Sequence, residues 1–348
     1  MNVAALSALL LLAAPSRAAS TPSAKDKRAL SAAIRLYHRL ELQQAAKGFD
    51  EELDAVPGWK TAAGFRAICR WTLGDNVGAT EDAQAASKLK PNDALSYAAR
   101  GKARLVLKNY DEALEDFRSA AENDPRSIEG PLGEGSTLSA QGKNREALAA
   151  LNRAVKLDPG SAAALLMRGS VKDRLRDFHG ASDDYGSLLE INQEFVWARL
   201  YRGKALRELK DYRAAEADFS IFIEANEENE NAHYLRSNVR FLLGDYQGAS
   251  ADLNKVIALN PRNGLAYSNR GQTRALLGDK DGAVSDLRKA LELDPQRREK
   301  IQAAIDALDA KAEPEPEAAA AKSASAPRTL PVPAKKSGAE DDLLFIEK

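Results

Sequence analysis

Arginine and aspartate recur together at two fixed places along most of this sequence, and ion pairing is the chemistry that their types allow. The pairs are Arg66 with Asp82, Arg100 with Asp116, Arg168 with Asp184, Arg202 with Asp218, Arg236 with Asp252, and Arg270 with Asp286. A guanidinium can offer a carboxylate two parallel hydrogen bonds, and a partly buried arginine is tolerable mainly when it is paired. We therefore expect structural Arg–Asp contacts within six segments of the chain. The alternative is a ladder of arginines that binds anionic ligands.

Residues suited to catalysis or metal binding are not grouped in the sequence. The histidines His38, His179 and His233 are far apart, with no HExxH pattern and no paired cysteines. No phosphate-binding glycine loop or nucleophile motif is present, and the glycines of EGPLGEGS at 129–136 belong to a predicted helix. The sequence therefore predicts no catalytic residue, no metal, no cofactor and no enzymatic activity.

A repeat of 34 residues positions the charged pairs. Prolines fall on one unbroken grid with this period, at Pro57, Pro91, Pro125, Pro159, Pro261 and Pro295. With the proline at the thirty-second place, repeats begin at residues 26, 60, 94, 128, 162, 196, 230 and 264, and each is named below by its first residue. The arginines and aspartates stand at the seventh and twenty-third places. Each pair would thus join the two halves of its own repeat.

The pattern within one repeat predicts two helices, A and B, joined by a polar turn. Many repeats have glycine at the eighth place and alanine at the twentieth, where small residues let two helices approach closely. The closing Asp-Pro stops helix B, because proline has no amide hydrogen and disfavours helical geometry in the residue before it. This spacing of Gly, Ala, aromatic and Pro places resembles the tetratricopeptide repeat, whose helix-turn-helix units stack into a superhelix.

The resemblance implies an all-α fold, an α-solenoid of stacked helix pairs. We expect a linker and a degenerate helical unit over 19–59, seven repeats over 60–297 and a capping helix over 298–311. The degenerate unit would shield the first regular repeat. Residues 312–348 are rich in Pro, Ala, Ser and charge, and this composition predicts a disordered tail.

Composition and the first residues indicate an exported protein. The 50 Lys and Arg residues balance 51 Asp and Glu residues, which gives no reason to expect a nucleic acid as partner. Residues 2–14 are apolar but too short to span a bilayer, and SRA at 16–18 has the small residues of a signal-peptidase site. We expect a signal peptide over 1–18 and a periplasmic or secreted protein without a stable membrane span. Its one cysteine, Cys69, allows no intramolecular disulfide.

The resemblance also implies a binding surface on helix A of each repeat, through its second, fifth and ninth places. The predicted partner-binding residues are Lys102, Leu132, Leu166, Trp197, Leu200, Lys204, Tyr234 and Asn238. The Lys and Asn set by which some members clamp a terminal carboxylate is not reproduced, since Tyr234 stands where the lysine beside Asn238 would be. We expect a partly apolar partner segment with one or two acidic residues along repeats 128 to 230. Alternatively, these side chains complete the packing between helices A.

These features favour a non-enzymatic protein–protein interaction scaffold of the cell envelope that binds a segment of another protein. The alternative is an accessory or regulatory subunit of an envelope enzyme or of a secretion or assembly machine. Residues 340–348, EDDLLFIEK, place four apolar residues behind an acidic cluster, a composition typical of docking segments, although the segment could equally have no binding role. The oligomeric state stays open.

Overall fold

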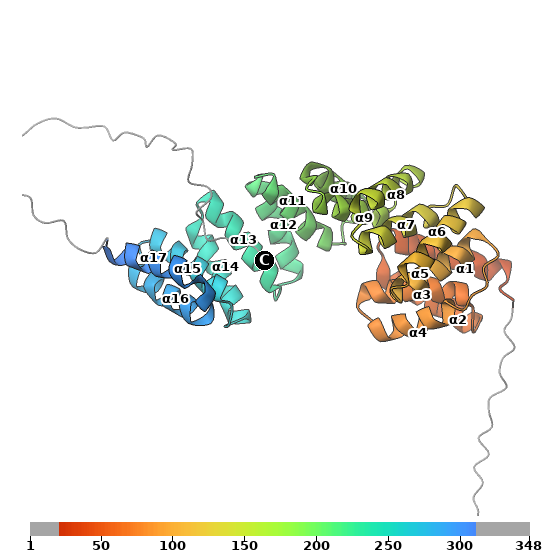
Figure 1. Ribbon diagram of the computed structural model, residues 1–348, viewed down its shortest axis with the longest axis horizontal. Helices are drawn as coiled ribbons and strands as arrows, with labels where there is room; N and C mark the ends of the chain where they lie inside the picture. The colour runs from red at the N-terminus through yellow and green to blue at the C-terminus, as the bar shows by residue number, and fades with distance from the viewer. Residues whose placement is uncertain (1–20, 311–348) are drawn as a thin grey trace, which may run out of the picture. The chain divides into compact units, whose positions relative to one another are not determined.

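Pairs of helices joined by short turns make up the part of the chain that the computed structural model describes, residues 21–310 (Figure 1). The helices A are α1 (Ala24–His38), α3 (Lys60–Leu73), α5 (Ala94–Val106), α7 (Glu129–Ala140), α9 (Ala162–Arg174), α11 (Trp197–Glu208), α13 (Glu230–Leu243) and α15 (Gly264–Leu276). The helices B are α2 (Leu42–Ala55), α4 (Asn76–Ala86), α6 (Tyr110–Asn123), α8 (Asn144–Leu157), α10 (Phe178–Ile191), α12 (Tyr212–Ala225), α14 (Tyr246–Leu259) and α16 (Lys280–Leu293). A short 3-10 helix, η1 (Pro295–Arg297), leads into α17 (Arg298–Ala310). Residues 21–310 contain no β-strand, and the fold is the predicted all-α solenoid.

A residue with left-handed backbone geometry at the fifteenth place ends helix A in every repeat. Glycine fills this place at Gly74, Gly142, Gly244 and Gly278, with φ between 76° and 88°. Leu40, Lys108, Arg176 and Lys210 adopt the same geometry in the other repeats, with φ between 59° and 63°. Side chains other than glycine rarely favour this region, so the stacking of the two helices imposes the turn.

An aspartate follows this turn in five repeats and caps helix B. The side chains of Asp75, Asp177, Asp211, Asp245 and Asp279 each accept the backbone N–H three residues further on. At the other end, α6, α8, α14 and α16 each stop two residues before a proline. Polar caps and prolines therefore fix both ends of helix B, as the sequence pattern predicts.

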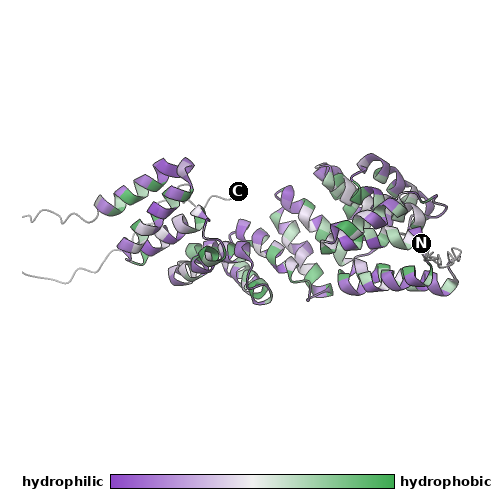
Figure 2. Cartoon of the chain, turned by 90° about the horizontal axis from the view of Figure 1, so that it is seen from below, coloured by the Kyte–Doolittle hydropathy of each residue, from purple (hydrophilic) through white to green (hydrophobic). Residues whose placement is uncertain are grey.

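Small residues let helices A and B touch within a repeat. A Cβ atom at Gly101 would lie 2.9 Å from the ring of Phe117, and one at Gly169 would lie 2.7 Å from the ring of Tyr185. The alanines at the twentieth place, among them Ala113, are completely buried. Figure 2 shows hydrophobic and hydrophilic residues alternating around the helices, as amphipathic packing requires.

The array divides into two compact bodies, which are described separately. The N-terminal body runs to Ala198 and the C-terminal body begins at Arg199, so the boundary falls inside α11. In the C-terminal body, α17 covers α16 by burying Ile301 and Ile305 against Leu287. None of the helices in residues 21–310 combines the length and hydropathy that crossing a bilayer requires.

In the N-terminal body the helices A close into a ring. Helix α1 contacts α3, as expected of a unit that shields the first regular repeat, and it also contacts α9. The side chain of Asn192, which follows α10, donates a hydrogen bond of 2.8 Å to the backbone oxygen of Arg39, which follows α1. One hydrophobic cluster accordingly joins Leu30 of α1 to residues of α3, α5 and α9.

Candidate partner-binding surface

Each of the six predicted Arg–Asp pairs is present within its own repeat. Nε and one Nη of the arginine both donate to the carboxylate, and the shortest contact is 2.6 or 2.7 Å in every pair. The aspartates are at most 6% exposed. These hydrogen bonds raise the pKa of Arg100, Arg202 and Arg270 above the ordinary value. Helix A is thus joined to helix B by two parallel hydrogen bonds in each of these repeats.

A second cation, at the eleventh place, contacts the same carboxylate in five of these repeats. The residues are Arg70, Arg104, Lys172, Arg240 and Arg274, at 2.8 to 3.0 Å from the aspartate. In repeat 196 the eleventh residue is Leu206, and Arg199 contacts Asp218 at 3.2 Å instead. This second cation could have been predicted from the sequence, because it stands four residues after the arginine at the seventh place, about one turn further along helix A.

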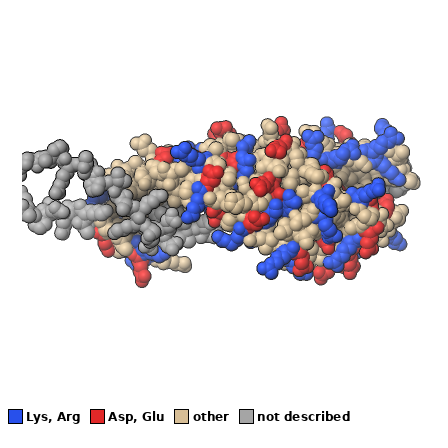
Figure 3. Space-filling view, turned by 90° about the horizontal axis from the view of Figure 1, so that it is seen from above, with Lys and Arg blue, Asp and Glu red and all other residues tan. Residues whose placement is uncertain are grey.

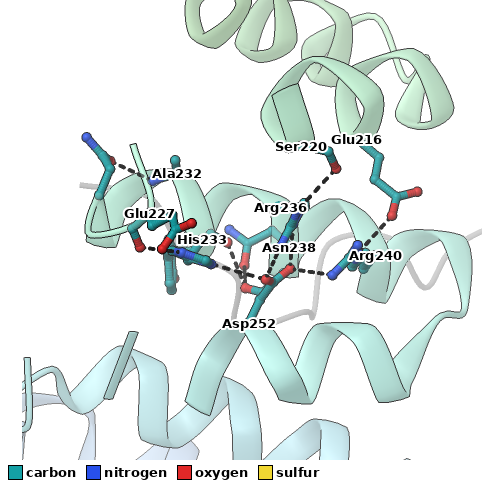
Figure 4. Close-up of polar contacts among 12 residues, drawn as sticks. Glu216, Ser220, Glu227, Ala232, His233, Arg236, Asn238, Arg240 and Asp252 are labelled. Atoms are coloured by element: carbon teal, nitrogen blue, oxygen red, sulfur yellow. Dashed lines mark hydrogen bonds and ion pairs between the residues drawn. The ribbon is translucent and has the colours of Figure 1, made fainter. Parts of the chain in front are cut away.

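The arginine at the seventh place also reaches the preceding repeat. Its remaining Nη donates to the residue at the twenty-fifth place there, in the pairs Arg66 with Asp50, Arg168 with Asn152, Arg236 with Ser220, and Arg270 with Asn254. Figure 4 shows this arrangement around Asp252, where Arg236 reaches back to Ser220 and Arg240 reaches back to Glu216. The arginines therefore also bind successive repeats together.

This use of the guanidinium groups argues against a ladder that binds anions. The six arginine side chains are only 13% to 27% exposed, and their N–H groups are directed at carboxylates within the array. On the face drawn in Figure 3, basic and acidic side chains lie interspersed. The Arg–Asp set is therefore structural, and a partner must be sought elsewhere.

The A-helix face of the N-terminal body is filled by the protein itself. Glu129 of α7 lies 3.0 Å from Nζ of Lys102 on α5 and 2.8 Å from Nε2 of His38 on α1. The same Nζ lies 5.3 Å from the ring centre of Tyr37 and 5.1 Å from that of Phe65, so it contacts two aromatic faces. A buried ionic group thus links α1 to α5 and α7.

Burial and charge act in opposite directions on this group. Burial raises the pKa of the Glu129 carboxyl, but Lys102 and His38 outweigh it and lower that pKa to about 2. Burial lowers the pKa of Lys102, but Glu129 outweighs it and the net shift is upward. Both residues are therefore held in their charged forms.

Half of the predicted partner-binding residues are buried within the array. Lys102 and Leu132 are each 3% exposed. Tyr37 of α1 covers Lys102, and Leu132 packs in a cluster with residues of α6, α8 and α9. Leu200, 3% exposed, and Asn238, 5% exposed, are buried in the C-terminal body. For these four residues the alternative, packing between helices, is the correct one.

The other predicted residues retain accessible surface. Trp197 is 42% exposed at the first turn of α11, and Lys204, Tyr234 and Leu166 are half-buried. Leu166 lies in the N-terminal body, whereas Lys204 and Tyr234 lie in the C-terminal body. Tyr234 packs against a hydrophobic cluster that includes Leu253. Trp197 also belongs to the N-terminal body, so Lys204 and Tyr234 are the residues of the predicted set that keep accessible surface in the C-terminal body.

A polar cavity of about 450 Å³ adjoins this face in the C-terminal body. Its lining residues are Glu228, Asn229, Glu230, Asn231, Tyr234 and Asn263. The Glu230 carboxylate accepts hydrogen bonds from the side chains of Asn260, at 3.1 Å, and Asn263, at 2.7 Å. Glu228 is exposed. Only Tyr234 was singled out from the sequence, because the acidic run before α13 carries no signal of a cavity.

Two carboxamides of α15 are incompletely hydrogen-bonded, and one of them contacts Tyr234. Asn269 of α15 donates a hydrogen bond of 3.1 Å to the hydroxyl of Tyr234, while its own Oδ1 has no hydrogen-bond partner among the described residues. Nε2 of Gln272 on α15 is also buried without a partner in residues 21–310. A buried amide group without a hydrogen-bond partner is costly. A ligand could donate a hydrogen bond to Oδ1 of Asn269 or accept one from Nε2 of Gln272.

The residues with catalytic or metal-binding potential stay apart. Residues 21–310 contain no group of three His, Cys, Asp or Glu side chains able to hold a metal ion. Cys69 is buried, its thiol contacts the backbone oxygen of Leu42 at 3.4 Å, and burial raises its pKa to about 12. The predicted signal peptide and tail lie outside the described residues.

Comparison with known proteins identifies the repeat. The Tetratricopeptide repeat family model matches residues 66–128, 132–187, 200–255 and 243–298, and the chain therefore belongs to the tetratricopeptide repeat family. Tetratricopeptide repeats indicate a protein–protein interaction scaffold, and the fold is generally non-enzymatic. No sequence among curated proteins matches the chain.

Two solved structures of low sequence identity, YrrB and Cut9–Hcn1, share the fold. YrrB, described as a TPR protein with an unusual peptide-binding site, is 22% identical with a TM-score of 0.52, over 55% of this chain and 98% of its own. The APC/C hetero-tetramer Cut9–Hcn1 is 15% identical with a TM-score of 0.59, over 80% of this chain and 55% of the matched chain. A tetratricopeptide repeat protein from Parabacteroides merdae is 24% identical with a TM-score of 0.43, over 72% of this chain and 98% of its own.

Proposed function

We propose that this protein is a non-enzymatic scaffold of the cell envelope that holds a segment of another protein on the A-helix face of its C-terminal body. The observation that carries the proposal is the position of Tyr234, which lines the polar cavity and also accepts a hydrogen bond from Asn269. Tyrosine supplies contact area and a polar tip, a combination common in residues that dominate binding.

The cavity favours a partner with a basic side chain. Glu228 and Glu230 line it, and no lysine or arginine is among its lining residues. This chemistry differs from the acidic partner expected from the sequence. Of the two lysines that motivated that expectation, Lys102 is already paired with Glu129, and Lys204 is half-buried. A lysine or arginine of the partner in this cavity would gain carboxylate and carboxamide contacts.

The unsatisfied amides favour an extended partner segment. Oδ1 of Asn269 accepts and Nε2 of Gln272 donates, and both lie on α15 one turn of helix apart. The backbone of an extended peptide presents N–H and C=O groups in alternation, so one segment can satisfy both amides. The partner would then be held by its main chain near Tyr234 and by a basic side chain in the cavity.

Affinity capture from envelope extract tests this function. We expect the proteins enriched by the unaltered chain to be lost with Tyr234→Ala and with Glu228→Lys. Trp71→Ala is the matched control, because Trp71 is 48% exposed but lies in the N-terminal body. Equal capture by the Tyr234→Ala variant and the control would refute the proposed surface.

The envelope location and the absence of catalysis are tested separately. The apolar residues 2–14 and the small residues at 16–18 support export. Mass spectrometry of the mature protein should find an N-terminus near residue 19, and a chain that still begins at Met1 in the cytoplasmic fraction would argue against export. The purified chain should show no turnover with any substrate of its captured partner.

A further inference from the structure

Two pairs of leucines are exposed at equivalent places of consecutive repeats in the C-terminal body. Leu242 and Leu243 end α13 and are 43% and 37% exposed. Leu276 ends α15 and is 54% exposed, and Leu277 follows it and is 42% exposed. They occupy the thirteenth and fourteenth places of two consecutive repeats. We call this set the leucine edge. Large apolar side chains grouped on a surface mark sites of interaction.

A groove lined by basic residues begins next to this edge. Lys280, three residues after Leu277, lines a groove of about 870 Å³ together with Arg288 and Lys289 of α16. Arg270 and Arg274 also line it, but both are engaged by Asp286. We call Lys280, Arg288 and Lys289 the cationic groove.

The cations of this groove are incompletely neutralised. Lys289 contacts Glu292 at 2.8 Å, whereas Lys280 and Arg288 form no ion pair within residues 21–310. Asp281 and Asp309 are the other acidic residues of the lining, so the basic residues of the groove exceed the acidic ones by one. The groove therefore favours an anionic occupant.

The other repeats indicate which partner Arg288 lacks, namely a carboxylate on the following helix A. Arg288 stands at the twenty-fifth place of its repeat, the place that contacts the seventh residue of the next repeat. Arg118 holds the same place in repeat 94 and meets the carboxylate of Glu134 at 3.5 Å. After Arg288 the seventh place falls on Ala304 of α17, which has no charge to offer. The acidic counterpart of Arg288 is therefore missing from residues 21–310.

We propose that residues 340–348 of this chain bind back across the cationic groove and the leucine edge. The segment reads EDDLLFIEK, with an acidic cluster followed directly by four apolar residues. The surface also has an apolar part and a basic part. They are neighbours, because Lys280 of the cationic groove is three residues after Leu277 of the leucine edge. Asp341 and Asp342 pair with Lys280 and Arg288, and Leu343 to Ile346 cover the leucine edge.

The chain can reach this surface from its last described residue. Asp309, at the end of α17, itself lines the groove. Residues 311–339, which connect α17 to the proposed segment, span up to roughly 100 Å when fully extended. A tether of this length gives the segment a high effective concentration at the groove, which favours binding within one chain over binding between two chains.

A labelled peptide competing with the chain's own segment tests the proposal. The probe is a fluorescent EDDLLFIEK peptide, added to the full-length protein and to the full-length Leu343→Ser/Leu344→Ser/Phe345→Ser variant. We expect the peptide to bind the variant at least tenfold more tightly than the unaltered protein, because the variant leaves the surface open. Leu276→Ser/Leu277→Ser, added to this variant, should abolish binding, and so should Lys280→Glu/Arg288→Glu.

Charge exchange and a matched control make the test specific. A peptide with Asp341→Lys and Asp342→Lys should bind the Lys280→Glu/Arg288→Glu protein and not the Lys280/Arg288 protein. Trp71→Ser/Leu73→Ser, at the exposed end of α3 in the other body, should change nothing. Peptide binding to no protein, equal binding to the unaltered protein and the triple-serine variant, or a concentration-dependent dimer that dissociates in the triple-serine variant would each overturn the proposal.

Discussion

Glu134 contacts Arg118 of the preceding repeat at 3.5 Å and also pairs with Arg153 of its own repeat. In six other repeats the seventh place holds an arginine and the twenty-third an aspartate. In four repeats the residue at the twenty-fifth place accepts a hydrogen bond from the arginine of the next repeat. Repeat 128 instead has Glu134 at the seventh place and Ala150 at the twenty-third, and a cation, Arg118, stands at the facing twenty-fifth place. The charges across this interface are exchanged, and their complementarity is kept.

The exchange predicts that repeat 128 can be converted to the common pattern. Glu134→Arg alone should lower the free energy of unfolding by about 1 to 2 kcal/mol, since the new cation would face Arg118 and Arg153. Adding Ala150→Asp and Arg118→Asn supplies the partners that the arginine has in other repeats, and should recover most of this loss. Urea denaturation followed by circular dichroism measures it. A triple variant no more stable than Glu134→Arg would contradict this interpretation of the array.

The left-handed backbone geometry at the fifteenth place of each repeat predicts a stabilising substitution. Lys108 is exposed and has φ of 62°, a geometry that costs a side chain roughly 1 kcal/mol and costs glycine almost nothing. Lys108→Gly should raise the free energy of unfolding by about 0.5 kcal/mol after allowance for the more flexible unfolded chain. Gly142→Ala, the reverse change at the same place of the next repeat, should lower it. Thermal melting of both variants is the measurement, and equal signs would refute the argument.

The Arg–Asp pairs could be predicted because a repeat of fixed length fixes their geometry. Once Arg66 and Asp82 are placed on two helices that cross at glycine and alanine positions, few arrangements remain, and the same argument holds in every copy. The left-handed residue at Lys108 could not be predicted in this way. Glycine signals that geometry at Gly142, but lysine does not, and only the common length of the repeats implies it.

The closure of the N-terminal body into a ring also could not be predicted from the sequence pattern of one repeat. Contact between α1 and α9 depends on small rotations accumulated over several repeats, which no single 34-residue unit records. Lys102 stands at a place that lines an open surface in a regular array, and it is buried here because α1 closes the ring and Tyr37 contacts its ammonium group. Prediction of binding residues therefore failed where long-range curvature decides their exposure.

The buried carboxylate of Glu129 predicts a dependence of stability on pH. Its pKa falls from an ordinary 4.5 to about 2 in the folded protein. Because the folded pKa is the lower one, the stabilisation is fully present above about pH 4.5 and is lost as the pH falls towards 2. A shift of this size corresponds to roughly 3 kcal/mol. Glu129→Gln should therefore destabilise the protein by about that amount at neutral pH, and the difference should disappear near pH 2.

A compensating variant separates charge from packing at this site. In Glu129→Gln the ammonium of Lys102 is left buried without its carboxylate, and Glu129→Gln/Lys102→Met removes both charges, which should restore much of the stability. Denaturation midpoints measured from pH 2 to pH 8 give all three curves. A constant difference between Glu129→Gln and the unaltered protein at every pH would show that the ion pairs do not stabilise the fold.

One side-chain hydrogen bond, from Asn192 to the backbone of Arg39, helps to close the ring, and a single substitution can remove it. Nδ2 of Asn192 donates to the backbone oxygen of Arg39, while Oδ1 of the same side chain accepts the N–H groups of Glu194 and Phe195. Asn192→Asp keeps the acceptor and loses the donor, whereas Asn192→Ala loses both. If the bond holds α1 against the rest of the body, both variants should speed amide hydrogen exchange in residues 24–38 by several-fold. Only Asn192→Ala should also loosen the start of α11. Unchanged exchange in α1 for both variants would show that its apolar face alone, through Leu30 and Ile34, closes the ring.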